Sequence, residues 1–62
     1  MKNVFEEVVK TKNATKGCEL MDWLTDNKVY FEVGLERKTY VFKIIANRLN
    51  VGSVRRYLSE VW

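Results

Sequence analysis

Apolar and polar residues alternate most regularly in the middle of the chain, in the segment KVYFEVGLERKTYVFKII that spans residues 28–45. The alternating apolar residues are Val29, Phe31 and Val33 in residues 28–34, and Tyr40, Phe42 and Ile44 in residues 39–45. Strict alternation of β-branched and aromatic residues is typical of strands with one buried face. The segment therefore predicts an antiparallel β-hairpin with strands at about 28–34 and 39–45.

The register of this hairpin follows from the side chains that would face each other. With residues 35–38 as a four-residue loop, every apolar residue of the first strand faces an apolar partner, in the pairs Val33–Tyr40, Phe31–Phe42 and Val29–Ile44. Such cross-strand pairs contribute about 0.2–1 kcal/mol each. A shift by one residue would set Phe31 opposite Val41 or Lys43 and spoil this match. We therefore expect the pairing with Val33 opposite Tyr40.

The N-terminal segment fits a short helix. Asn3 and Glu6 have the spacing of a capping box, and an apolar stripe follows, made of Val4, Phe5, Val8 and Val9. The valines weaken this prediction, because β-branched side chains lose rotamer freedom in a helix. A strand from Val4 to Lys10 is the alternative.

Two further helices are predicted. The first begins near Thr15 or Lys16, after a polar loop, and ends at Asp26, where Asn27 tolerates the left-handed conformation of a helix end. Its apolar face would hold Cys18, Leu20, Met21, Trp23 and Leu24. The second follows Ser53 as N-cap and has its apolar face at Val54, Tyr57, Leu58 and Val61. The elements then predict a single α+β domain over residues 1–62, in the order α-α-β-β-α.

The size of the chain bears on its stability. A domain of 62 residues buries only about 60% of the surface that its unfolded chain exposes, so its core is marginal. Small domains gain stability from disulfides, metals or partner subunits. One cysteine excludes an internal disulfide, and the lack of histidine makes a zinc site improbable. Self-association is the remaining route, and we expect a homodimer without a metal or a cofactor.

Several functional classes are poorly supported. No apolar run approaches the roughly 20 residues of a membrane span, and Glu6 and Glu7 interrupt any signal-peptide core, so we expect a cytoplasmic protein. Without histidine, the commonest acid–base group near neutral pH is absent. The thiol of Cys18 would be mostly protonated without a basic partner. We therefore expect a protein that is not an enzyme.

Charge is distributed unevenly along the chain. Residues 1–36 hold five lysines and seven acidic residues, whereas residues 37–62 hold six cations and a single acid, Glu60. The six cations are Arg37, Lys38, Lys43, Arg48, Arg55 and Arg56. This asymmetry indicates a polyanionic partner. We therefore hypothesise a regulatory module that binds nucleic acid through these six residues.

Two other interpretations compete with this hypothesis. Residues 45–58 faintly resemble the helix-turn-helix of DNA-binding regulators, but Ile45 belongs to a strand in the predicted register, which leaves too short a first helix. The other class is a protein-binding inhibitor or adaptor that acts through the hairpin edge or an aromatic surface. Trp23 and Trp62 exceed what so small a core readily buries, and tryptophan is enriched at interfaces, so both are candidate interface residues.

Overall fold

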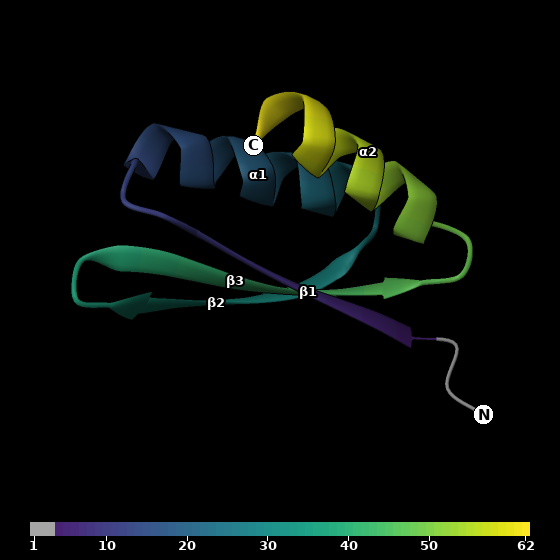
Figure 1. Ribbon diagram of the computed structural model, residues 1–62, viewed down its shortest axis with the longest axis horizontal. Coiled ribbons are helices and arrows are strands. Elements are labelled where there is room, and N and C mark those ends of the chain that lie inside the picture. Colours follow the sequence, from purple (N-terminus) through teal and green to yellow (C-terminus); the bar gives the residue numbers. More distant parts are fainter. Residues whose placement is uncertain (1–3) are drawn as a thin grey trace.

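The computed structural model describes residues 4–62, which form a three-stranded antiparallel sheet with both helices on one of its faces (Figure 1). The elements are β1 (Val4–Thr11), α1 (Ala14–Asp26), β2 (Tyr30–Glu36), β3 (Thr39–Asn47) and α2 (Val51–Val61). The predicted α+β class is confirmed, but the predicted order is wrong, because the chain runs β-α-β-β-α. The strands lie in the order β1-β3-β2, so β3 is central and the other two strands form the edges.

The predicted N-terminal helix is wrong. The first element is a strand, which is the alternative prediction for these residues. β1 pairs with β3 along its whole length, from Val4 opposite Asn47 to Thr11 opposite Tyr40. This ladder satisfies the backbone hydrogen-bonding groups of β1. The valines of the strand are β-branched, and such side chains fit a pleated sheet better than a helix. The predicted cap Asn3 lies outside the described residues.

The hairpin is confirmed, but its predicted register is wrong by two residues. The turn has two residues, Arg37 and Lys38, with φ angles of 51° and 65°. Both values are those of a type I′ turn, whose twist matches that of the strands. β2 therefore continues to Glu36, and Val33 faces Phe42 instead of Tyr40, which faces Leu35. Because the shift is an even number of residues, each side chain stays on its predicted face of the sheet.

The core lies between the helices and the middle of β3. Its buried side chains are Leu20, Leu24, Val29, Phe42, Ile44, Ala46 and Val54. β3 supplies three of the seven because alternate residues of a central strand point to the covered face, and neighbouring strands shield it on both sides. The opposite face of the sheet bears no helix (Figure 1).

α1 begins earlier than predicted, and its end differs in detail. The side chain of Asn13 accepts a hydrogen bond from the backbone N–H of Lys16 at 3.1 Å, which makes Asn13 the N-cap and leaves almost no loop after β1. At the other end, Asn27 has a φ of −94°, and Lys28, with a φ of 56°, takes the left-handed conformation instead. Cys18 is exposed and does not belong to the apolar face.

The start of α2 also corrects a prediction. Its N-cap is Asn50, whereas Ser53 lies inside the helix. Asn47 and Asn50 hold the preceding turn through reciprocal hydrogen bonds of 2.8 and 3.0 Å between side-chain oxygens and backbone N–H groups. Since residues 39–47 form a strand, no first helix exists for a helix-turn-helix. Neither helix of residues 4–62 has the length and apolar composition needed to cross a bilayer.

Candidate nucleic-acid interface

The six predicted cations lie in separate places. Arg37 and Lys38 form the β2–β3 turn, and Arg48 lies in the β3–α2 connection, at the opposite end of a molecule 35 Å long (Figure 1). Arg55 and Arg56 lie on α2, on the helical side of the sheet. Lys43, in the middle of β3, points to the open face of the sheet, as Glu6 does. The structure therefore does not bring the six residues together in one surface.

Three of the six are paired with carboxylates. The pairs are Lys43 Nζ–Glu6 Oε1 at 3.8 Å, Arg55 Nε–Glu7 Oε1 at 3.3 Å and Arg56 Nε–Glu60 Oε2 at 3.4 Å. Such exposed pairs contribute at most about 1 kcal/mol to stability. They nevertheless place a negative charge beside each cation, which weakens its attraction for a phosphate.

Two of these three pairs are a consequence of β1 being a strand. Consecutive residues of a strand point to opposite faces, so Glu6 lies on the open face with Lys43, and Glu7 lies on the helical side with Arg55. The Arg55 guanidinium also lies over the Phe5 ring, 5.7 Å from its centroid. β1 thus brings acidic residues of the N-terminal half onto cations of the C-terminal half and neutralises them.

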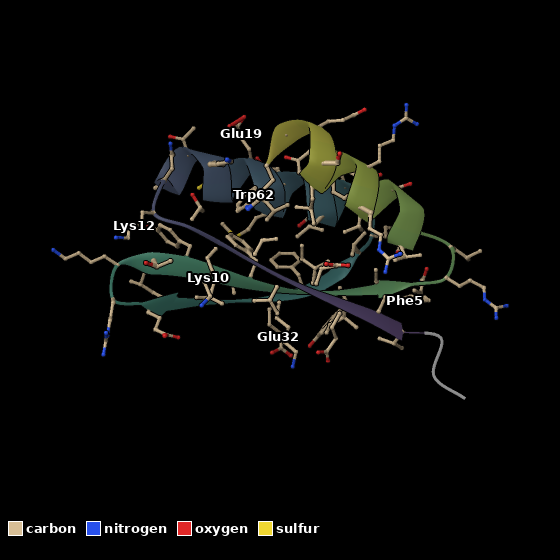
Figure 2. All side chains as sticks on the ribbon, in the orientation of Figure 1. Phe5, Lys10, Lys12, Glu19, Glu32 and Trp62 are labelled. Carbon is tan, nitrogen blue, oxygen red and sulfur yellow. The ribbon has the colours of Figure 1, made fainter. Side chains whose placement is uncertain are left out.

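A different set of cations gathers at the turn end of the sheet, and we name it the hairpin-end cluster. Its members are Lys10, Lys12, Arg37 and Lys38. Thr11, the last residue of β1, faces Tyr40, the second residue of β3, and Lys10 and Lys12 lie in the same half of the molecule as the β2–β3 turn (Figure 2). All four members are exposed, and none forms an ion pair within residues 4–62. Residues 8–13 and 34–41 contain one acid, Glu36.

Sequence reasoning found only half of this cluster. Lys10 and Lys12 belong to the acidic half of the chain, and their proximity to the turn depends on the pairing of β1 with β3. The alternative prediction of a strand over residues 4–10, extended by two residues, would have placed both lysines near the turn. A neighbouring lysine, Lys16, has another partner: its Nζ donates to the main-chain oxygen of Trp62 at 3.0 Å and lies 4.8 Å from the ring centroid.

Both candidate interface tryptophans pack within the chain. Trp23 stacks on Tyr57 between the two helices, with ring centroids 4.4 Å apart and an interplanar angle of 20°. Trp62 meets Phe42 edge to face at 6.3 Å. Both indoles are half-buried and cover the core from its helical side. An interface role for them stays a prediction.

Two further properties of the described residues concern metal binding and the pKa of Tyr57. Within residues 4–62 no group of three or more cysteine, histidine or acidic side chains could hold a metal ion. Burial, together with the carboxylate of Glu19, raises the pKa of Tyr57 above its ordinary value. Comparisons of the chain with protein-family models, curated proteins and solved structures found no match.

Proposed function

We propose that the chain is a non-catalytic module that binds the phosphate backbone of nucleic acid through the hairpin-end cluster. The observation that supports this most is that four exposed cations at the turn end of the sheet have no carboxylate partner within residues 4–62, whereas Lys43, Arg55 and Arg56 each have one. The proposal keeps Arg37 and Lys38 of the predicted set and adds Lys10 and Lys12.

The backbone of the turn gives independent support. Arg37 and Lys38 both have positive φ, a conformation that costs a side-chain-bearing residue roughly 1–2 kcal/mol. Asn-Gly is the usual sequence for a two-residue turn of this kind. Strain of this type is concentrated at functional sites. Both residues are exposed at the end of the hairpin, where a ligand can approach them.

The mechanism is electrostatic. The planar guanidinium of Arg37 can donate two parallel hydrogen bonds to one phosphate, and the three lysines act as point charges for neighbouring phosphates. Four such contacts on duplex DNA predict a log–log salt slope of about −3 to −4 for the association constant. Backbone contacts carry little sequence information, so binding to unrelated sequences should be similar in strength.

The experiment compares two double variants that each remove two positive charges: Arg37→Gln with Lys38→Gln, and Arg55→Gln with Arg56→Gln. Fluorescence anisotropy with a labelled 20-base-pair duplex and a labelled single-stranded RNA measures the affinity, and circular dichroism checks the fold. The turn variant should weaken binding about tenfold or more, and the α2 variant much less. Equal affinity of the turn variant and the wild-type chain, or a larger loss in the α2 variant, contradicts the proposal.

A protein-binding module is the second candidate, and exposed apolar side chains on β2 favour it. Val33 and Leu35 are 46% and 67% exposed at the edge of the sheet. Under this alternative, neither probe binds in a salt-dependent manner, and the turn variant behaves as the wild-type chain does.

A further inference from the structure

The edge strand β2 exposes a continuous apolar row. On the helical side of the sheet its side chains are Phe31, Val33 and Leu35, opposite Ile44, Phe42 and Tyr40 of β3. Phe31 is half-buried, whereas Val33 and Leu35 are 46% and 67% exposed. Proline, bulges and charges in the inward row are the usual protection of an edge strand against pairing. This row of β2 contains none of them.

The same three residues carry the unpaired backbone N–H and C=O groups at this edge of the sheet. In a hairpin with a two-residue turn, the closing pair, here Glu36 and Thr39, exchanges both of its hydrogen bonds. Alternate residues of β2 counted back from Glu36 therefore direct their N–H and C=O groups to β3. Phe31, Val33 and Leu35 direct theirs away from the sheet.

We propose that β2 pairs with β2 of a second copy of this chain, antiparallel and centred on Val33, to form a six-stranded sheet. In this register Val33 faces Val33 of the second copy, and Phe31 faces Leu35 on either side of the two-fold axis. All seven residues of the strand are paired, and the outward backbone groups of one copy meet those of the other. The row of apolar side chains becomes continuous across the interface.

Charge selects this register over its neighbours. The centred pairing sets Glu32 opposite Gly34 and Tyr30 opposite Glu36, so no charged side chain directly faces a like charge. A displacement by two residues in one direction sets Glu32 against Glu32 of the second copy, and in the other direction against Glu36. Like charges directly opposite each other destabilise a strand pair.

The other edge, β1, is less suited to this pairing. The middle of its helical-side row is Glu7, which is bound to Arg55. On the open face its exposed valines alternate with Glu6 and Lys10. An apolar row without charge is therefore found on β2 and not on β1.

Sedimentation equilibrium of the wild-type chain and two matched variants tests the proposal. The wild-type chain should show twice the 7.4 kDa mass of a single copy. Val33→Lys places a charge at the two-fold axis and should give a folded monomer, since the side chain is 46% exposed within one copy. Val8→Lys makes the same change on β1, at a residue that is 57% exposed, and should leave the dimer intact. A monomeric wild-type chain, a dimeric Val33→Lys or a monomeric Val8→Lys each overturns the proposal.

Cysteine cross-linking tests the register independently of any loss of folding. Both variants are made in a Cys18→Ser background. Directly facing residues of a hydrogen-bonded pair have Cα atoms about 5.5 Å apart, a spacing that a disulfide spans, so Val33→Cys should form a covalent dimer under mild oxidant. Leu35→Cys should stay monomeric on a denaturing gel, because the two copies of that residue are offset by about 13 Å along the strands. Equal cross-linking at both positions, or only at 35, rejects the centred register.

Discussion

The cations at the β2–β3 turn and those on α2 have different environments, although both are adjacent pairs in the basic half of the chain. Arg55 and Arg56 are each within 3.4 Å of a carboxylate oxygen. Arg37 and Lys38 have no carboxylate partner and occupy a backbone conformation that long side chains rarely adopt. The pairing of Arg55 is long-range, because Glu7 is 48 residues away in the sequence, whereas Arg56 is paired with Glu60 one turn further along the same helix.

This comparison shows why charge counted along a chain is a poor guide to charge on a surface. The acidic half and the basic half of this chain are interleaved in the sheet, with β1 against β3. Opposite charges therefore meet in the middle of the sheet, as Lys43 and Glu6 do. Within residues 4–62, the cations without a carboxylate partner include Arg48 in the β3–α2 connection and the four at the turn end of the sheet, where both chain segments are basic.

A large effect is expected from Lys10, in β1, and Lys12, just after its end. Lys10→Gln with Lys12→Gln should weaken duplex binding about tenfold at low salt and reduce the magnitude of the salt slope by about two, since each phosphate contact contributes about one. Titration by anisotropy at four salt concentrations measures both quantities. A variant with the wild-type slope would mean that β1 contributes nothing to the cluster, and that only the turn binds.

Replacing the two turn residues should weaken nucleic-acid binding while it stabilises the fold. Arg37→Asn with Lys38→Gly introduces the sequence preferred in type I′ turns and should stabilise the chain by about 1 kcal/mol. In a chain of this size that corresponds to a rise in Tm of about 4–8 °C. The same variant should bind nucleic acid less tightly, because it lacks two cations. Thermal melts followed by circular dichroism measure the change in Tm. A lower Tm would mean that Arg37 and Lys38 already suit this turn better than Asn and Gly do.

A smaller effect is expected from releasing a paired cation. Glu7→Gln removes the carboxylate beside Arg55 and should raise affinity for the duplex about two- to threefold at low salt, because an additional cation becomes available. Glu19→Gln, which makes the same change on α1, serves as the control for net charge. Equal gains in the two variants would show that overall charge, and not the pairing, limits binding.

Much of the fold could be predicted because β3 alternates so regularly. Phe42 and Ile44 are fully buried, as their parity predicts, and the faces of the hairpin are those expected. The exact register depends on the turn, and Arg37-Lys38 lacks the Asn-Gly signal that would have placed positive φ angles there. The sequence pattern therefore predicts a loop at Leu35, whereas this residue extends β2.

The N-terminal strand and half of the candidate site could not be predicted from local pattern. One stripe of a helix would contain Val4, Phe5, Val8 and Val9, whereas in the strand these residues lie on both faces of the sheet. The apolar pattern therefore matches neither the helical nor the strand period throughout. What decides the conformation is the ladder to β3, with partners more than 28 residues away in sequence. Lys10 and Lys12 join the turn only through that ladder.

The smallest expected effect concerns Tyr57, which reports whether α2, with its paired arginines, packs on α1 as described. Burial and the Glu19 carboxylate raise its pKa above the ordinary value of about 10. Since the raised pKa belongs to the folded state, this contribution to stability is complete below pH 10 and is lost as pH rises through the folded pKa. Urea unfolding between pH 8 and 11.5 should therefore show wild-type stability falling relative to Tyr57→Phe only above pH 10. If the two chains keep a constant difference across this range, the hydroxyl is solvated and the two helices do not enclose it.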